Sequence, residues 1–564
     1  MTSSLLTSKI TNASISGESD RAVWQRLAPF FLVMLAAAVM FFANLGAHPL
    51  FNPDESLYAE PAREMLDTGE YITTLLNYAV RFTKPPLVIW AMALSYNIFG
   101  VCEFAARFFE AACGLALIGC TYFFVEKYAS RTAAFIAAFS LLTAPLFVGT
   151  AREAITDMPL SLFIAGALMA FFHGFQEKSG RFRWLGYALV GLAVMTKGPV
   201  GLVLPLGIIF CFHLWRGELT TAWRYYKPVG GLALVAAISL PWFCTEIYLT
   251  KGAYYQEFLV RENFQRFTSV VDHKGAWWYH IAAVAGGYFP WTVFAPQALL
   301  AALRPGLSFR ADQSSGSQAA DQSRFIFFCA LSFVIVLSFF SISISKLLPY
   351  TLPGFPFLAA LVGVYLGNAL ARTTPGAAPT RIAVPLALLA AATGLALYLV
   401  PHLIVRLREM PPELPTVIHQ ALVRLLVAAL AALGALVFKR PRLGLTVFAA
   451  AVFVSFLTSG SKALEILSAE WEGPVPAFAK FAALSGDPIV VWHMRKPSIT
   501  FYAGRKVLIP ADATQLDETM KGLPRAYVIA KVADLPALAH LPDCRLLVKQ
   551  GRFALLRRQA DTSP

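Results

Sequence analysis

The chain has 564 residues, of which 57% are hydrophobic and only 14% are charged, and its mean hydropathy is +0.59. Soluble domains carry about 25% charged residues, whereas apolar runs close to the ~20 residues needed to span a bilayer recur here from residue 27 to about residue 460. This composition excludes a soluble globular enzyme, a disordered chain and a disulfide scaffold, and it predicts a polytopic membrane protein.

The net charge is +14, from 47 basic and 33 acidic residues. In membrane proteins, lysine and arginine collect in cytoplasmic loops and contact anionic lipid headgroups. We therefore expect membrane lipids, and not nucleic acid, as the partners of this charge. The seven cysteines include no C-x-x-C pair, so the sequence predicts neither a zinc cluster nor a disulfide framework.

Fourteen apolar segments follow one another along the chain, and thirteen of them are predicted to cross the membrane. The exception is 86–100, which is short and begins at a pair of prolines, so it is expected to be interfacial or re-entrant. The predicted spans lie near 27–46, 104–125, 132–149, 157–175, 184–199, 200–214, 228–248, 281–303, 325–342, 350–371, 382–402, 418–438 and 443–460.

Loop charge sets the predicted orientation, because lysine and arginine are enriched on the cytoplasmic side. Thirteen spans and a cytoplasmic N-terminus place these basic residues inside: Lys127, Arg131, Lys178, Arg181, Arg183, Arg216, Arg224, Lys227, Arg304, Arg310, Arg324, Arg372, Arg381, Lys439, Arg440 and Arg442. The outer face then receives 47–103, the turn 150–157, the loop 249–280 and the tail after residue 460.

The tail differs in character from the rest of the chain. PIVVW, ITFYAG, KVLIP, AYVIA and RLLVKQ are typical of short strands, and ATQLDETMKG is typical of a helix. We expect an all-α membrane domain over 1–462, with outer loops 47–103 and 249–280, and a small outer α/β domain over 463–564. The tail has no phosphate-binding loop, metal spacing or catalytic triad, so we interpret it as a lid or partner platform.

The first polar motif, 52–60, follows the first span and contains the adjacent carboxylates Asp54 and Glu55. Such acids beside a membrane helix cost free energy unless they contact water, a metal or a basic ligand, so both are candidate site residues. Tyr58 is four residues after Asp54 and would share its helix face. The alternative for Asp54 is an N-cap, because aspartate is a favoured N-cap residue.

Lysines stand in three further outer-face motifs. In FTKPPL, Lys84 is held in extended backbone by the following prolines, and it is either a snorkelling lysine or a phosphate ligand. In TKGP, Lys197 lies in an apolar hairpin, where an ionisable residue indicates a functional site. In SKLLPY, Lys346 follows a span and lies close in sequence to Tyr350.

Two other outer segments carry candidate residues. Asp157 in AITDMP is a second acid on the same face, with an N-cap as the alternative because a proline follows in the first turn. The loop 261–279 interleaves basic residues, including Arg266 and His273, with aromatics, and the alternative here is an aromatic belt at the membrane interface. Together the motifs predict an outward-facing cavity that binds phosphorylated, lipid-linked ligands.

The motifs NPDESLYAEPAREMLDTGEY, FTKPPL, AITDMP, TKGP, ENFQRF, HKGAWWY, GGYFPW and SKLLPYTLPGFP resemble those of the GT-C family of polyprenyl-phosphate glycosyltransferases, over roughly residues 25–370. They are most similar to the bacterial aminoarabinose transferases that modify lipid A. The family implies about thirteen transmembrane helices, a C-terminal periplasmic domain, and an enzyme in the bacterial inner membrane whose active site faces the periplasm. Its implied reaction transfers 4-amino-4-deoxy-L-arabinose, with inversion, from undecaprenyl phosphate to a lipid A phosphate, which gives resistance to polymyxin and other cationic peptides.

The same resemblance implies roles for residues at matching positions. Asp54 would be the leading catalytic carboxylate and Asp157 the second. The substrate-binding residues would be Glu55, Tyr58, Lys84, Lys197, Arg266, His273, Lys346 and Tyr350. Among these, Lys84 would hold the polyprenyl phosphate, and Arg266 and His273 would meet the acceptor or the leaving phosphate.

Two positions depart from the family pattern. Thr83 stands where many members have glutamate before the lysine, and Asn263 stands where many have histidine. Both changes remove potential metal ligands, so no cofactor is predicted and the need for a divalent metal is left open.

A lipid A phosphate is already anionic and hardly needs a general base. We therefore hypothesise that Asp54 positions the acceptor or the sugar amine, while Lys84 and neighbouring cations stabilise charge on the departing undecaprenyl phosphate. One alternative keeps the fold but uses a protein hydroxyl, as in protein O-mannosyltransferases, or another glycolipid as acceptor. A lipid transporter is the other, but it would predict inverted repeats and broken helices near the midplane.

Overall fold

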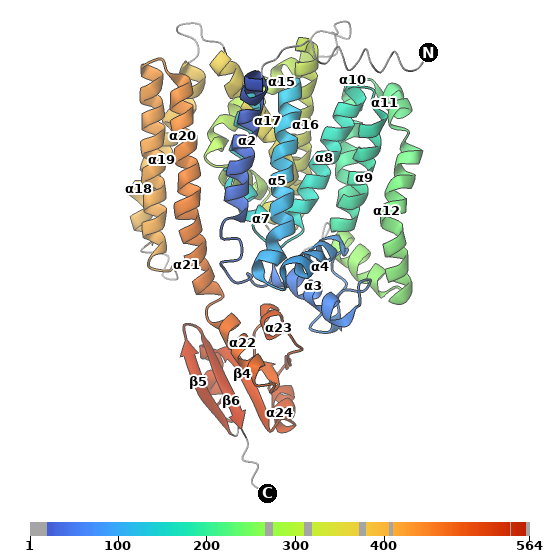
Figure 1. Cartoon of the computed structure of the whole chain (residues 1–564), viewed down its shortest axis with the longest axis vertical. Helices are drawn as coiled ribbons and strands as arrows, with labels where there is room; N and C mark the ends of the chain where they lie inside the picture. The colour runs from blue at the N-terminus through green and yellow to red at the C-terminus, as the bar shows by residue number, and fades with distance from the viewer. Residues whose placement is uncertain are drawn as a thin grey trace.

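The computed structural model describes residues 20–265, 275–308, 318–371, 379–404, 410–541 and 543–559. These residues form a helical bundle with a small sheet domain at one end of it (Figure 1). Arg266 and His273 lie outside the described residues. The end of the bundle that adjoins the sheet domain is called the cavity end below.

The bundle is built from helical segments that alternate in direction along the chain. These are α2 (Asp20–Phe42), α5 (Glu103–Tyr128), α6 (Arg131–Leu142) with α7 (Pro145–Ala151), α8 (Asp157–Gln176), α9 (Gly180–Lys197), α10 (Val200–Arg216), α12 (Pro228–Leu249), α14 (Tyr279–Gly287) with η2 (Trp291–Phe294) and α15 (Ala295–Ser308), α16 (Gln318–Ile342), η3 (Leu348–Gly354) with α17 (Phe355–Ala371), α18 (Pro379–Ile404), α19 (Leu414–Val437), and α20 (Pro441–Ser455) continued by η4 (Phe456–Gly460) and α21 (Ser461–Trp471). Counted with each interrupted helix as one, they correspond one by one to the thirteen predicted spans.

Length and composition support most of these segments as membrane spans. Within the described ranges, nine helices are long and apolar enough to cross a bilayer, and α6 with α7, bent by 66° at their break, is a tenth. The segments that fall short are α9, which carries charges near both ends, α10, which has 17 residues, and the interrupted α14–α15. The polytopic all-α architecture is confirmed. That these three segments also cross the membrane, which would make thirteen spans, stays a prediction.

The excluded apolar segment 86–100 forms α4 (Leu87–Phe99), a helix of only 13 residues. Together with α3 (Ser56–Thr68), it lies across the cavity end of the bundle (Figure 1). A short hairpin, β1 (Leu75–Leu76) with β2 (Ala79–Val80), joins the two helices. The structure therefore agrees with the expectation that this segment does not cross the bundle.

The sheet domain has a four-stranded sheet in the order β3-β4-β6-β5, in which β3 and β4 are parallel and the other pairs antiparallel. Its elements are α22 (Val475–Leu484), β3 (Ile489–Val491), α23 (Ser498–Ala503), α24 (Ala513–Lys521), β4 (Arg525–Lys531), η5 (Val532–Asp534), α25 (Leu535–Leu538), β5 (Cys544–Gln550) and β6 (Phe553–Gln559). An α/β domain is thus confirmed.

One strand expectation in this domain is wrong. ITFYAG forms the short helix α23, which follows Pro497 and ends at Gly504 with φ of +64°. A proline before the first turn and a left-handed glycine after the last one favour a helix, and these end signals outweigh the β propensity of the residues between them. KVLIP contributes a single bridge, from Leu508 to Val490.

Two apolar cores meet at the cavity end. The larger one runs through the bundle from α2 to α20. The second is shared between the sheet domain and the two helices α3 and α4: Ala59 and Met92 belong to the same buried cluster as Phe478, Ile499 and Tyr527. Because this core is continuous, the sheet domain is fixed to the segment that carries the first polar motif.

Candidate functional site

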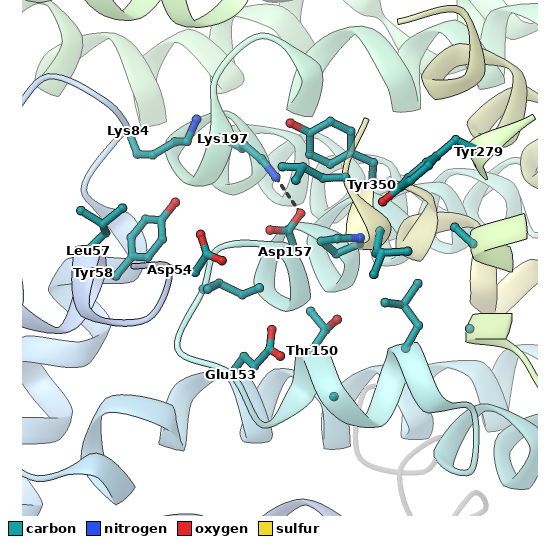
Figure 2. Close-up of a pocket in the computed structure, with 18 of the residues that line it drawn as sticks. Asp54, Leu57, Tyr58, Lys84, Thr150, Glu153, Asp157, Lys197, Tyr279 and Tyr350 are labelled. Carbon is teal, nitrogen blue, oxygen red and sulfur yellow. Dashed lines mark hydrogen bonds and ion pairs between the residues drawn. The ribbon is translucent and has the colours of Figure 1, made fainter. Parts of the chain in front are cut away.

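A cavity of about 820 Å³ opens at the cavity end of the bundle. Its polar lining comes from segments far apart in the sequence: Asp54, Tyr58, Arg81, Lys84, Glu153, Asp157, Lys197, Glu262, Tyr279 and Tyr350. The rest of its wall is largely apolar and includes Leu146, Ala282, Ala283, Leu348 and Pro349. Figure 2 shows several of the polar side chains pointing into this space.

Asp54 and Tyr58 reach the cavity from the start of α3. The helix begins at Ser56 with Glu55 at the N-cap position, so Asp54 lies one residue outside the cap. Its carboxylate points into the cavity (Figure 2). Tyr58, one turn further along, lines the same space, and burial raises the pKa of its hydroxyl, so Tyr58 enters the site as a neutral hydrogen-bonding group.

Asp157 and Lys197 form an ion pair inside the cavity. Their Oδ1 and Nζ atoms are 2.6 Å apart, and the lysine nitrogen lies 4.8 Å from the ring centroid of Tyr350. Lys197 is the last residue of α9, which ends at Gly198 with φ of +78°, so the turn delivers the lysine to the wall. Asp157 is the first residue of α8, after the N-cap Thr156, and its carboxylate serves this ion pair.

A second group of cations comes from the extended segment after β2. Lys84 Nζ lies 3.8 Å from Oε2 of Glu262, which is carried by the π-helix η1 (Tyr255–Gln265). Arg81 lies over the ring of Tyr58, 5.5 Å from its centroid, and donates a hydrogen bond to the carbonyl of Leu57. Burial lowers the pKa of Arg81, but an arginine stays cationic near neutral pH.

Glu153 adds a fourth carboxyl group to the cavity wall, after Asp54, Asp157 and Glu262. It lies in the turn between α7 and α8, and Figure 2 shows it below Asp54 and Asp157. Burial, with the negative charges of Glu55 and Asp54, raises its pKa to about 8. At neutral pH the site therefore combines a protonated acid with two aspartates, Glu262 and three cations.

Glu55, expected to bind substrate, does not line the cavity. Its carboxylate is buried and paired with Arg107, with 2.7 Å between Oε2 and Nη2. It also accepts the backbone N–H groups of Phe51 and Ala154, both at 2.8 Å. Glu55 thus ties the segment before Asp54 to the turn that carries Glu153, which explains why it points away from the ligand space.

Lys346 is not a lining residue either. It is only 4% exposed, and its Nζ donates to the carbonyls of Phe340 and Ser341 at 3.2 and 2.6 Å. These carbonyls belong to the last turn of α16, so the lysine caps that helix end.

The structure brings together six of the ten predicted site residues: Asp54, Tyr58, Lys84, Asp157, Lys197 and Tyr350. Sequence reasoning passed over Arg81, which directly precedes FTKPPL, and Glu153, which directly precedes AITDMP. Their charge at an outer-face turn was the available signal. Nothing local in the sequence distinguishes Glu262 or Tyr279 from other residues of their loop.

Among the described residues, no three His, Cys, Asp or Glu side chains are grouped so that they could hold a metal ion. Thr83, at the position where many family members have glutamate, lines the cavity next to Lys84.

Parts of the chain are similar in sequence to known proteins. Residues 83–243 match the family model described as dolichyl-phosphate-mannose-protein mannosyltransferase. An uncharacterised protein of Aquifex aeolicus is 31% identical over 340 residues, which cover 60% of this chain and 73% of the relative. An undecaprenyl phosphate-alpha-4-amino-4-deoxy-L-arabinose arabinosyl transferase of Aeromonas hydrophila is 31% identical over 331 residues, or 57% of each chain. The chain spans about three fifths of the length of most curated relatives it matches.

The fold has a solved counterpart. The crystal structure of ArnT from Cupriavidus metallidurans bound to undecaprenyl phosphate superimposes with a TM-score of 0.79, covering 95% of this chain and 99% of the other at 23% identity. The helical bundle, the sheet domain and the motif-lined cavity agree with these relationships. The chain belongs to the GT-C family of polyprenyl-phosphate glycosyltransferases.

Proposed function

We propose that this chain transfers 4-amino-4-deoxy-L-arabinose from undecaprenyl phosphate to a phosphate of lipid A, with inversion at the anomeric carbon. One observation carries the proposal: a single cavity is lined by the carboxylate of Asp54, by the cations Lys84, Arg81 and Lys197, and by an apolar wall. A polyprenyl-phosphate sugar needs all three features, namely cations for the phosphate, polar groups for the sugar and apolar surface for the isoprenoid.

Lys84 and Arg81 are the groups best placed to hold the donor phosphate. They come from one short segment, and both line the cavity. Lys84 contacts Glu262 at 3.8 Å, a distance longer than a direct charge-assisted hydrogen bond of about 2.8 Å. An incoming phosphate would compete with that carboxylate for the lysine.

The chemistry is a single displacement. An oxygen of the acceptor phosphate attacks the anomeric carbon, the bond from that carbon to the donor phosphate oxygen breaks, and the electron pair leaves with undecaprenyl phosphate. Lys84 and Arg81 stabilise the charge that develops on the leaving group. Because neither phosphate needs to gain or lose a proton, Asp54 acts by positioning the acceptor or the sugar amine.

Asp157 and Lys197 complete the site as a fixed ion pair. Each holds the other in one geometry at 2.6 Å, so together they present a polar, nearly neutral surface to the sugar. Tyr350 stacks against the lysine and closes this side of the cavity.

The compartment and partners follow from the same proposal. The bacterial inner membrane, with the cavity facing the periplasm, is where undecaprenyl-linked sugar and newly made lipid A meet. Modified lipid A carries fewer net negative charges, which would lower its affinity for polymyxin. The name of the Aeromonas hydrophila relative supports the choice of sugar donor.

A second candidate is favoured by the family model over residues 83–243, whose description names protein mannosylation. A protein hydroxyl is a poor nucleophile until it loses its proton, so Asp54 would then act as a general base. The two candidates differ in the acceptor, and they predict different losses on replacing Asp54 by Asn.

The test is mass spectrometry of lipid A from cells that lack their own aminoarabinose transferase, with and without this chain. We expect an aminoarabinose adduct with the wild-type chain and none with Asp54→Ala. Equal expression of both chains is checked in the membrane fraction. No adduct despite good expression and a supplied donor would refute the lipid A proposal and favour a different sugar or acceptor.

A further inference from the structure

The segment that leads into Asp54 is held by the sheet domain, through Asn52. The Asn52 backbone N–H donates to Oε1 of Glu472 at 3.0 Å, and its side-chain Nδ2 donates to Oε2 of the same carboxylate at 2.5 Å. Nδ2 also lies 2.6 Å from the Ser498 hydroxyl, and the Ser498 backbone N–H donates to Asn52 Oδ1 at 3.0 Å. Both polar ends of the asparagine are therefore bonded to residues more than 400 positions away.

Glu472 is built to receive these bonds. It follows α21 directly, it is only 2% exposed, and it accepts a third donor, Lys496 Nζ, at 3.0 Å. A buried carboxylate with three donors is stable, whereas one that loses a partner is left with an uncompensated charge. Two of these three donors belong to Asn52, so the carboxylate and the asparagine hold each other in place.

The contact also extends to the other side of Asp54. Asn52 Oδ1 accepts a hydrogen bond from the Ser56 hydroxyl at 2.8 Å, at the first residue of α3. Asp54 lies between these two anchors. Asp54 is two residues from each anchor, and two residues of extended chain span at most about 7 Å. With Asn52 and Ser56 both fixed, the Asp54 backbone therefore has little freedom.

We propose that the Asn52–Glu472 contact is a positioning device for Asp54, so that the sheet domain sets the place of the leading carboxylate in the cavity. Asn52 and Glu472 are not among the residues that line the cavity, so they would act through Asp54. This inference rests on the proposed function for its activity readout, and it assigns the sheet domain a part in transfer where sequence reasoning expected a lid or partner platform.

A swap of polarity tests the contact. Asn52→Asp places a second carboxylate against Glu472, and Glu472→Gln turns an amide donor toward the asparagine donor. The double variant N52D/E472Q restores a donor facing an acceptor, with the direction of the bond reversed. Misplacement of a reacting group by about 1 Å can cost up to about 100-fold in rate, so we expect each single variant to lower kcat by about 10- to 100-fold.

The expected pattern separates positioning from loss of fold. Affinity for undecaprenyl phosphate should change by less than about twofold in the single variants, because the phosphate-binding cations are elsewhere, and the double variant should recover kcat to within about threefold of wild type. Ser498→Ala removes one bond with little risk to folding, and we expect it to lower kcat by about threefold. If the kcat of the double variant were no higher than that of the single variants, the proposal would be overturned.

Asn77 offers a matched control in the same interface. Its side chain exchanges two hydrogen bonds of 2.9 Å with the backbone of Val507, again between the segment before α4 and the sheet domain. Asn77→Ala should keep kcat within about threefold of wild type even if it lowers the melting temperature. If Asn77→Ala reduced kcat as much as Asn52→Asp does, the effect would be general docking and the positioning role would be wrong.

Hydrogen–deuterium exchange of residues 50–60 provides a readout that needs no acceptor. We expect faster exchange in the single variants and near wild-type exchange in the double variant. If the wild-type chain shows no lipid A transfer, the proposed function fails while this readout still tests the contact. If exchange rises in the single variants but their kcat is unchanged, the contact orders the segment without positioning Asp54, and the inference fails alone.

Discussion

At the scale of single residues, Lys84 and Glu262 make opposite contributions to the proposed phosphate site. Their side chains are 16% and 15% exposed and lie 3.8 Å apart. We expect Lys84→Ala to weaken binding of undecaprenyl phosphate by about 10- to 100-fold, because hydrogen bonds to charged groups contribute about 1.5–3 kcal/mol. Glu262→Gln removes a competing carboxylate whose ion pair is worth at most about 1 kcal/mol, so we expect binding to tighten by about two- to fivefold.

Isothermal titration of the purified chain in lipid nanodiscs measures both effects. Lys251→Ala is the control, because Lys251 is exposed at the end of α12 and does not line the cavity. Weaker binding by Glu262→Gln would contradict the competition and make the carboxylate part of the binding site itself.

The protonation state of Glu153 predicts a pH dependence of the same binding. Its pKa is raised to about 8, so the carboxyl is neutral at pH 7 and becomes negative as the pH rises through 8. A phosphate monoester is already dianionic above pH 7 because its second pKa is about 6. The added negative charge in the cavity should therefore raise the Kd for undecaprenyl phosphate by about threefold between pH 7 and 9.

Glu153→Gln should bind undecaprenyl phosphate with the same Kd at both pH values, because its amide does not titrate. The measurement is the ratio of the Kd at pH 9 to that at pH 7 for each chain. If the ratio for Glu153→Gln were as large as that for the wild-type chain, the pH dependence would belong to another group and not to Glu153.

At the scale of elements, two helices of the bundle approach closely through small residues. Gly363 and Gly367 on α17 face Ala133 and Ala137 on α6, and a Cβ added to Gly363 would lie 2.4 Å from the backbone oxygen of Ala133. Small residues four apart let membrane helices pack backbone against backbone. Because backbone cannot move aside cheaply, we expect Gly363→Ala to destabilise the bundle by about 1–3 kcal/mol.

The matched control is Gly394→Ala on α18, where an added Cβ would meet nothing within 4 Å. The measurement is the thermal unfolding midpoint in detergent, which should fall for Gly363→Ala and stay the same or rise for Gly394→Ala, since alanine favours a helix more than glycine does. Equal midpoints for the two variants would mean that α6 and α17 can separate to admit a methyl group.

Element types were predictable where one local signal dominated. The apolar runs gave the helices of the bundle, and the short length of α4 set it apart. The alternative that Asp54 and Asp157 are N-caps is wrong for a physical reason. Both stand at helix starts, but the carboxylate of Asp157 is paired with Lys197 and that of Asp54 lines the cavity. The strand predicted for ITFYAG is wrong because the end signals at Pro497 and Gly504 favour a helix over six residues whose own propensity favours a strand.

At the scale of the whole molecule, the site depends on partners that no local pattern reveals. Glu55 looked like a ligand because its buried partner, Arg107, stands 52 positions later in the chain. Lys346 differs, because its partners are the carbonyls at the end of the preceding helix, only five and six positions before it. The face shared by the motifs was predictable from loop charge, whereas the orientation of each side chain within that face required the packed bundle.

The order of crossings also predicts how the molecule lies in the membrane. α2 begins at the end of the bundle away from the sheet domain, and the sheet domain lies beyond the last helix at the other end (Figure 1). An odd number of crossings follows, which agrees with thirteen spans and not with fourteen. Basic residues occupy the connections at the end away from the cavity, including Lys127, Lys178 and Lys439, so that end is expected to be cytoplasmic.

Two exposed positions report the two sides: Glu518 on α24 of the sheet domain, and Thr221 on α11 (Leu219–Tyr226) at the opposite end. In a chain whose seven native cysteines are replaced, a membrane-impermeant maleimide added to intact spheroplasts should label Glu518→Cys and leave Thr221→Cys unlabelled. After lysis both should react, and the cysteine-free parent should react under neither condition. Labelling of Thr221→Cys alone would put the cavity in the cytoplasm, where it would not meet lipid A on the outer leaflet, and would refute the proposed acceptor. Labelling of both positions in intact spheroplasts would require an even number of crossings between them and would contradict the order of spans from α12 onward.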